Sequence, residues 1–214
     1  MLRRTFIAGG GAGVLTACAT ANPTPSDAAE AAFPPIGEIF GAPGRTVHAT
    51  DDGRGDGPPV IMIHGASGNV RDWTFDIVPR LSAKRRVIAM DRPGFGYSER
   101  TGEDGWRPTL QAAQLRDAAR EMGAEKPIIV GHSWGAAVAL AWALETPEDV
   151  TGVVAVSGVT TPWGGIVPTL DALGFGSLIA GFYTRRITRT AEEGGVERFI
   201  QRAFRPQAAP SGYL

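Results

Sequence analysis

The sequence predicts an α/β protein built on a mostly parallel, doubly wound sheet of about six strands. Short apolar runs without alternation recur along the chain, which is typical of strands covered on both faces. These runs alternate along the chain with stretches of helical periodicity, as in successive βαβ units. The residues able to carry chemistry follow directly after the runs, where open parallel sheets bind their ligands.

The predicted elements follow one another in this order. We expect strands at residues 44–50, 59–63, 86–90, 127–130 and 150–157. A helix is expected over 70–82, where Val70, Trp73, Ile77 and Leu81 have helical spacing, and further helices over 110–122 and 134–145. The segment 134–145 is apolar nearly all round, so we expect that helix to be buried against the sheet.

Composition excludes several classes of function. A net charge of −1 and the lack of a dense basic block give no footprint for nucleic acid, so we expect no such partner. The single cysteine, Cys18, excludes an intramolecular disulfide and any zinc site built on several cysteines. We predict neither a metal nor a cofactor. The chain has only three histidines, which are His48, His64 and His132.

The first 18 residues have the pattern of an export signal. Arg3 and Arg4 precede an uncharged stretch, residues 6–17, that is shorter than the roughly 20 residues needed to span a bilayer. Residues 15–18, Leu-Thr-Ala-Cys, resemble a bacterial lipobox, which implies lipidation of Cys18 and attachment to a membrane. The arginine pair resembles a twin-arginine signal, with general secretion as the alternative. We therefore expect an exported protein, either periplasmic or a membrane-anchored lipoprotein.

Residues 19–35 are rich in proline and alanine and are expected to form a tether ahead of the folded domain. The domain itself is expected over residues 36–157.

One short motif indicates a nucleophilic serine. The apolar run 127–130 leads into Gly-His-Ser-Trp-Gly at residues 131–135, and a helix follows. This strand–turn–helix context is what a G-x-S-x-G nucleophile motif requires. Gly131 and Gly135 are expected because a Cβ would crowd the tight turn. We predict that Ser133 is the nucleophile, placed at a helix N-terminus that favours a developing negative charge.

Two more segments extend this pattern. Residues 64–69, His-Gly-Ala-Ser-Gly-Asn, follow the second predicted strand, and residues 91–98, Asp-Arg-Pro-Gly-Phe-Gly-Tyr-Ser, follow the third. With the serine motif, residues 59–157 resemble the serine-nucleophile, cap-bearing branch of the α/β-hydrolase family. The resemblance implies an oxyanion hole formed by the N–H groups of Ala66 and Trp134. It also implies that His64 and Gly65 shape the loop beside this hole, while Asp91 is expected to stabilise its own loop.

The resemblance also indicates the reaction. Family members that open epoxides or remove halide carry aspartate at the nucleophile position, whereas this chain has Ser133. A serine supports acyl transfer, so we expect cleavage of a small ester or a related acyl substrate through an acyl-enzyme.

The acid and the base of a catalytic triad are not found in this chain. In this fold the triad runs serine, acid, histidine in chain order, yet no histidine follows Ser133. Residues 158–214 resemble the start of a helical cap, with helices expected at 178–190 and 191–204. We expect a truncated hydrolase of impaired activity. The alternative is a catalytically dead surface lipoprotein or fragment that binds a small apolar ligand.

Overall fold

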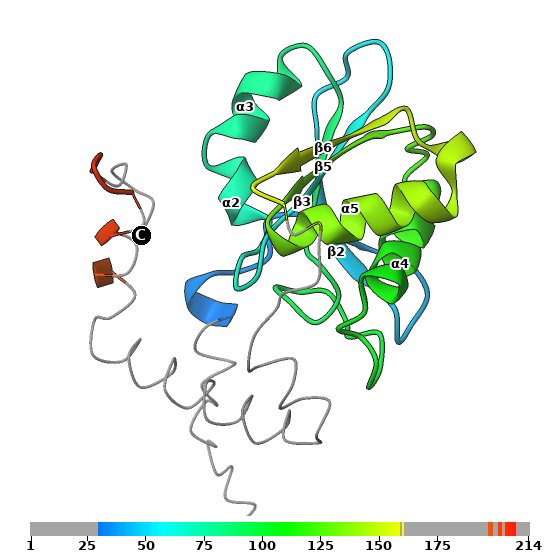
Figure 1. The fold of residues 1–214 in the computed structure, drawn as a ribbon, viewed down its shortest axis with the longest axis horizontal. Helices are drawn as coiled ribbons and strands as arrows, with labels where there is room; N and C mark the ends of the chain where they lie inside the picture. The colour runs from blue at the N-terminus through cyan, green and yellow to red at the C-terminus, as the bar shows by residue number, and fades with distance from the viewer. Residues whose placement is uncertain (1–29, 159, 161–196, 199–200, 203, 209–214) are drawn as a thin grey trace, which may run out of the picture. The chain divides into compact units, whose positions relative to one another are not determined.

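The computed structural model describes residues 30–158, 160, 197–198, 201–202 and 204–208 (Figure 1). The expected signal with Cys18, most of the tether and nearly all of the expected cap therefore lie outside the described residues. Within the helix expected at 191–204, the described residues 197–198 and 201–202 are helical. The chain divides into two units, residues 1–35 and 36–214, and the fold below belongs to the second.

Six strands of the described residues form one sheet in the order β1-β2-β4-β3-β5-β6. Their bounds are β1 Glu38–Phe40, β2 Val47–Asp52, β3 Val60–Ile63, β4 Val87–Met90, β5 Ile128–His132 and β6 Gly152–Val156. The pairs β3–β4, β3–β5 and β5–β6 are parallel, while β2 runs antiparallel to both β1 and β4. The predicted α/β class with a mostly parallel sheet is thus confirmed. The first predicted strand begins three residues later than expected, and β1 was not predicted.

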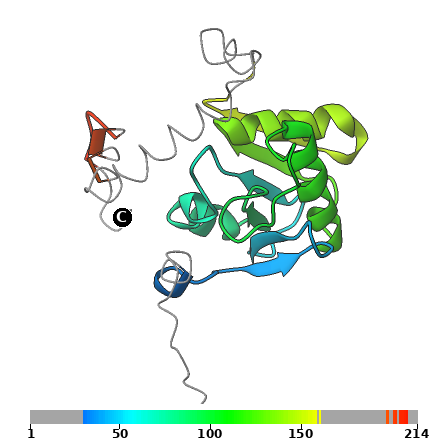
Figure 2. The ribbon, with the colours of Figure 1, turned by 90° about the horizontal axis from the view of Figure 1, so that it is seen from below.

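Within the described residues, α-helices cover both faces of this sheet (Figure 2). They are α2 Arg71–Thr74, α3 Ile77–Ser82, α4 Pro108–Glu121 and α5 Trp134–Glu145. Alternate residues of β3 and β4 divide between two buried clusters, so that Ile61 and Ile88 pack with α4 and α5 whereas Met62 and Ala89 pack with α2 and α3. Burial of both faces explains why these strands read as continuous apolar runs.

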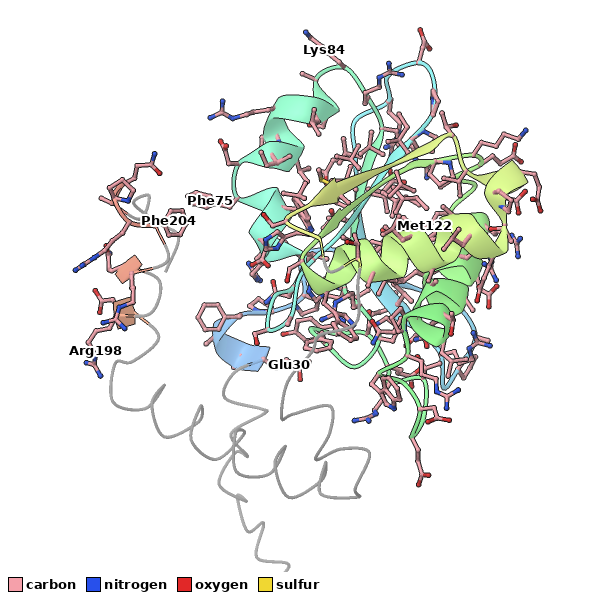
Figure 3. The ribbon with its side chains drawn as sticks, viewed as in Figure 1. Glu30, Phe75, Lys84, Met122, Arg198 and Phe204 are labelled. Carbon is pink, nitrogen blue, oxygen red and sulfur yellow. The ribbon has the colours of Figure 1, made fainter. Side chains whose placement is uncertain are left out.

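The prediction of a single helix over residues 70–82 was wrong. The chain forms two short helices there, and Phe75 at their junction points away from the sheet (Figure 3). The break changes which residues face inward. Val78 is buried, while Ile77 and Leu81, two of the four residues with the helical spacing, are exposed.

Helix α5 packs against the sheet as predicted, because Ala136, Val138, Ala139 and Trp142 are buried. Its far end is less covered, and Leu144 is 81% exposed within the described structure. None of the helices in the described part of the chain is long and apolar enough to cross a membrane.

The register of the parallel strands brings the predicted site together. Ile63 of β3 pairs with Met90 of β4 and with Gly131 of β5. The three strands therefore end at one level, and the residues that follow them lie at a single edge of the sheet.

Candidate active site

Ser133 occupies a strained turn between β5 and α5. Its backbone angles are φ 52° and ψ −116°, whereas a serine normally has a negative φ. The Ser133 N–H donates to the Val156 carbonyl at 2.9 Å, and the Ser133 carbonyl accepts from the Ala136 N–H at 3.1 Å. Bonds to β6 and α5 thus hold the strained conformation. Such strain costs on the order of 1–3 kcal/mol and is concentrated at functional residues.

The two glycines of the motif leave space for neighbouring backbone. A Cβ on Gly131 would overlap the Gly135 carbonyl group, and a Cβ on Gly135 would overlap the carbonyl oxygens of Ile63 and His64. The atoms in the way are all backbone, so they cannot rotate aside. The crowding predicted from the sequence is present.

The loop after β3 contacts this turn. A Cβ built on Gly65 would lie 2.9 Å from His132 Nδ1 and 3.3 Å from Ser133 Cβ. The Gly68 N–H donates to the Gly65 carbonyl at 3.4 Å, and Ser67 has φ 64°, the left-handed value found at the third position of a type II turn. The structure therefore brings the predicted oxyanion loop beside the predicted nucleophile.

Two backbone N–H groups beside Ser133 are available to an acceptor. Ala66 is exposed, and Trp134 is the first residue of α5, where helical N–H groups lack internal partners. Within the described residues neither N–H has a hydrogen-bond partner. These are the groups that the resemblance to α/β-hydrolases implies for an oxyanion hole, and their catalytic role stays a prediction.

His64 is used in structural hydrogen bonds. Its Nε2 accepts the Arg92 N–H at 2.9 Å, so the ring proton is on Nδ1, which donates to the Gly65 carbonyl at 2.8 Å. Burial and the nearby Arg92 charge lower the pKa of His64 from 6.5 to about 4. A neutral imidazole with both nitrogens engaged is not placed to take a proton from Ser133.

Asp91 organises the loops at the strand ends. Its Oδ1 accepts the Val70 N–H at 2.7 Å, and its Oδ2 accepts the Tyr97 N–H at 3.0 Å and His48 Nδ1–H at 2.8 Å. His48 Nε2 in turn accepts the Gly37 N–H at 3.0 Å. The loop-stabilising role predicted for Asp91 is confirmed. The sequence did not predict the His48 partner, because only the antiparallel pairing of β2 with β4 brings the two residues together.

Asp72 is a further acid near the site that sequence reasoning missed. It lies on α2, and a Cβ on Gly68 would overlap its carboxylate. Burial raises the pKa of the Asp72 carboxyl, while the charge of His132 acts in the opposite direction. His132 is partly exposed, and no hydrogen bond joins it to Ser133 in the described part of the structure.

The described residues contain no cluster of three or more His, Cys, Asp or Glu side chains that could hold a metal ion. A pocket of about 480 Å³ opens at α2 and α3. It is lined by Ile36, Thr50, Asp52, Thr74, Val78, Pro79 and Ser82.

Comparison with known proteins agrees with this geometry. The family model described as alpha/beta hydrolase fold matches residues 58–193, which is more than half of the chain. The chain therefore belongs to the α/β-hydrolase fold family.

Its relatives are hydrolases of several kinds. The chain is 35% identical over 144 residues to 2-hydroxymuconate semialdehyde hydrolase of Pseudomonas sp. (strain CF600), covering 65% of this chain and 49% of that protein. It is 31% identical over 133 residues to epoxide hydrolase B of Mycobacterium tuberculosis (strain ATCC 25618 / H37Rv), covering 61% and 36%. The chain thus spans about half or less of the length of these relatives.

Solved structures show the same fold. An epoxide hydrolase from an endophytic Streptomyces is 30% identical with a TM-score of 0.54, and the match covers 63% of this chain and 40% of that one. The wild-type Cfl2 structure from Burkholderia cenocepacia has a TM-score of 0.59 at 21% identity, covering 78% and 63%, and so shows likeness of fold alone.

Proposed function

We propose that this chain is a serine hydrolase that cleaves a small ester or a related acyl compound. The observation that carries the proposal is the strained Ser133, which lies beside the N–H groups of Ala66 and Trp134, for which the described residues offer no acceptor. Ser133 Oγ would attack the substrate carbonyl carbon, and the two N–H groups would stabilise the resulting oxyanion. Expulsion of the alcohol would leave an acyl-enzyme, which water then hydrolyses.

The identity of the nucleophile favours carbonyl substrates over epoxides. Epoxide hydrolases are among the similar proteins, but the epoxide-opening branch of the family uses aspartate where this chain has Ser133. A serine ester is a normal intermediate of acyl transfer. The likeness to 2-hydroxymuconate semialdehyde hydrolase is compatible with a carbonyl substrate.

We further propose that hydrolysis by this chain is slow. No histidine follows Ser133 in the 214 residues, and His64 and His48 are engaged in structural hydrogen bonds. Without a general base the serine hydroxyl stays weakly nucleophilic. An oxyanion hole still supports residual catalysis when members of a triad are lost.

Two proposals are tested together, that Ser133 is the nucleophile and that hydrolysis is slow for lack of a base. The measurement is turnover of p-nitrophenyl acetate by the full chain and by Ser133→Ala, with and without added imidazole. We expect slow turnover above the Ser133→Ala background, which imidazole raises by acting as an external base. Equal turnover in the two proteins would overturn Ser133 as the nucleophile. Fast Ser133-dependent turnover that imidazole leaves unchanged would overturn the proposal that hydrolysis is slow for lack of a base.

A second candidate function is ligand binding without catalysis by a surface lipoprotein. The lack of a histidine after Ser133 and the Leu-Thr-Ala-Cys segment ending at Cys18 favour it. A chain of this kind would leave Ser133 unreactive toward fluorophosphonates.

Export and lipidation at Cys18 belong to both candidates. Palmitate labelling of the full chain, compared with Cys18→Ser, tests the lipidation. Labelling of the variant would exclude Cys18 as the lipidated residue.

A further inference from the structure

Arg92 is a buried cation beside the oxyanion loop. Its residue is only 2% exposed, and burial lowers the pKa of its guanidinium to about 10. Among the described residues no carboxylate forms an ion pair with it, in contrast to Arg86, which pairs with Asp51 at 2.7 Å. Buried charges are costly unless their donors are well placed, so the contacts of this guanidinium matter.

The guanidinium is fixed between two oxygens and an aromatic ring. Its Nη1 donates to Gln111 Oε1 at 2.9 Å, its Nη2 donates to the Gly65 carbonyl at 3.0 Å, and its central carbon lies 4.3 Å from the centre of the Phe95 ring. Gln111 is itself oriented, because its Nε2 donates to the Gly105 carbonyl at 2.7 Å. The Arg92 Nε has no partner in the described structure. Nη2 is therefore held in one place, on the Gly65 oxygen.

The Gly65 carbonyl belongs to the same peptide group as the Ala66 N–H. A trans peptide is planar, so its carbonyl and its N–H point in opposite directions. Arg92 Nη2 and His64 Nδ1, at 3.0 and 2.8 Å, hold the carbonyl oxygen on the buried side of the loop. The Ala66 N–H is thereby turned to the other side. Glycine has the freest backbone of all residues, so this peptide needs such anchors to keep one orientation.

We propose that Arg92 is a positioning residue of the oxyanion hole: by binding the Gly65 carbonyl it fixes the orientation of the Ala66 N–H beside Ser133. This inference rests on the proposed serine-hydrolase function. A hydrogen bond from a cation is roughly twice as strong as one between neutral groups, and it also polarises the peptide so that the Ala66 N–H becomes a better donor. Arg92 itself touches no reacting atom.

The test measures the second-order rate constant for phosphonylation of Ser133 by a p-nitrophenyl alkylphosphonate. This reaction places negative charge on an oxygen in the hole, and it needs no second catalytic step. The variants are Arg92→Met, which keeps the length but loses charge and donors, and Arg92→Lys, which keeps the charge. Arg86→Met is the matched control, since Arg86 is also a hydrogen-bonded, partly buried arginine but directly precedes β4, at the opposite end of that strand from Arg92. Each protein is compared at the same interval below its own Tm.

Loss of one oxyanion donor outright typically costs about 10²–10³-fold in rate. Because Arg92→Met misorients the donor without removing it, we expect a fall of about 10- to 100-fold, with partial recovery in Arg92→Lys. Arg86→Met is expected to lower Tm and to leave the rate constant within about twofold of wild type, an effect size well below 1 kcal/mol.

A purely structural role predicts that Arg92→Met loses stability but reacts as fast as Arg86→Met, and that result would overturn the inference. If Arg92→Met does not fold, Gln111→Leu keeps Arg92 but removes the acceptor of its Nη1, together with the bond from Gln111 to the Gly105 carbonyl. It should slow phosphonylation about fivefold, the effect of one ordinary hydrogen bond. An unchanged rate in Gln111→Leu would then overturn it. Phosphonylation of Ser133→Ala at the wild-type rate would instead refute the proposed function.

Discussion

Replacing Gly135 with alanine tests the contact that holds the serine turn against the end of β3. The added Cβ would overlap the carbonyl oxygens of Ile63 and His64, which are backbone atoms of a fully buried strand end. Overpacking of this kind costs about 1–3 kcal/mol, here toward the upper limit because no side chain can move aside. Alanine returns about 1 kcal/mol of helix propensity, since Gly135 lies in the first turn of α5. The net loss is about 2 kcal/mol.

For a chain of this size a loss of about 2 kcal/mol corresponds to a fall in Tm of about 4–8 °C. Thermal denaturation followed by circular dichroism measures it. Gly152→Ala is the control, because no atom lies within 4 Å of the new Cβ there and φ is not left-handed. We expect its Tm to stay level or rise slightly. A Gly135→Ala protein that melts with the wild type would refute the argument that this turn requires glycine for lack of space.

Other predictions concern strain, protonation and buried hydrogen bonds. Ser133→Gly should raise the free energy of unfolding by about 1 kcal/mol in urea denaturation because glycine adopts φ 52° without strain, whereas Ser133→Ala should not. The pKa of His64 is about 4 in the folded chain against 6.5 as its ordinary value, so only the unfolded chain gains this proton between those pH values. Stability is therefore lost as pH falls from 6.5 to about 4, by up to about 3 kcal/mol, and His64→Gln should remove that part of the pH dependence. Asp91→Ala should lower stability by about 3 kcal/mol, measured by urea denaturation, because the buried N–H of Val70 and the partly buried N–H of Tyr97 lose the Asp91 carboxylate as acceptor. Loss of less than about 1 kcal/mol there would contradict the role given to Asp91.

The sheet centre and the serine turn could be predicted because their signals are local. Strands β3 and β4 consist entirely of buried residues, and both faces of the sheet are covered, so the runs stand out in the sequence. The serine turn combines such a run with two glycines whose neighbours leave no space for a side chain.

What could not be predicted depends on partners distant in sequence. His48 and Asp91 meet only because β2 joins the sheet antiparallel to β4, and nothing near either residue indicates that pairing. Arg92 is the same case, since its guanidinium reaches Gln111 of α4 and the loop after β3. The prediction of one helix over residues 70–82 was wrong for another reason. The helical spacing from Trp73 to Ile77 gives no sign of a break between them. In the structure α2 ends at Thr74, and α3 begins at Ile77 after Phe75 and Asp76.

The proposal to be tested most directly is that Ser133, although weakly nucleophilic without a base, is the nucleophile of this α/β-hydrolase chain. The most direct measurement is mass spectrometry of the full chain after reaction with a fluorophosphonate, followed by peptide mapping. We predict a single adduct on Ser133 and none in Ser133→Ala. Labelling of other serines alone, or an unlabelled chain whose folded state is verified by circular dichroism, would contradict the claim and favour the ligand-binding alternative.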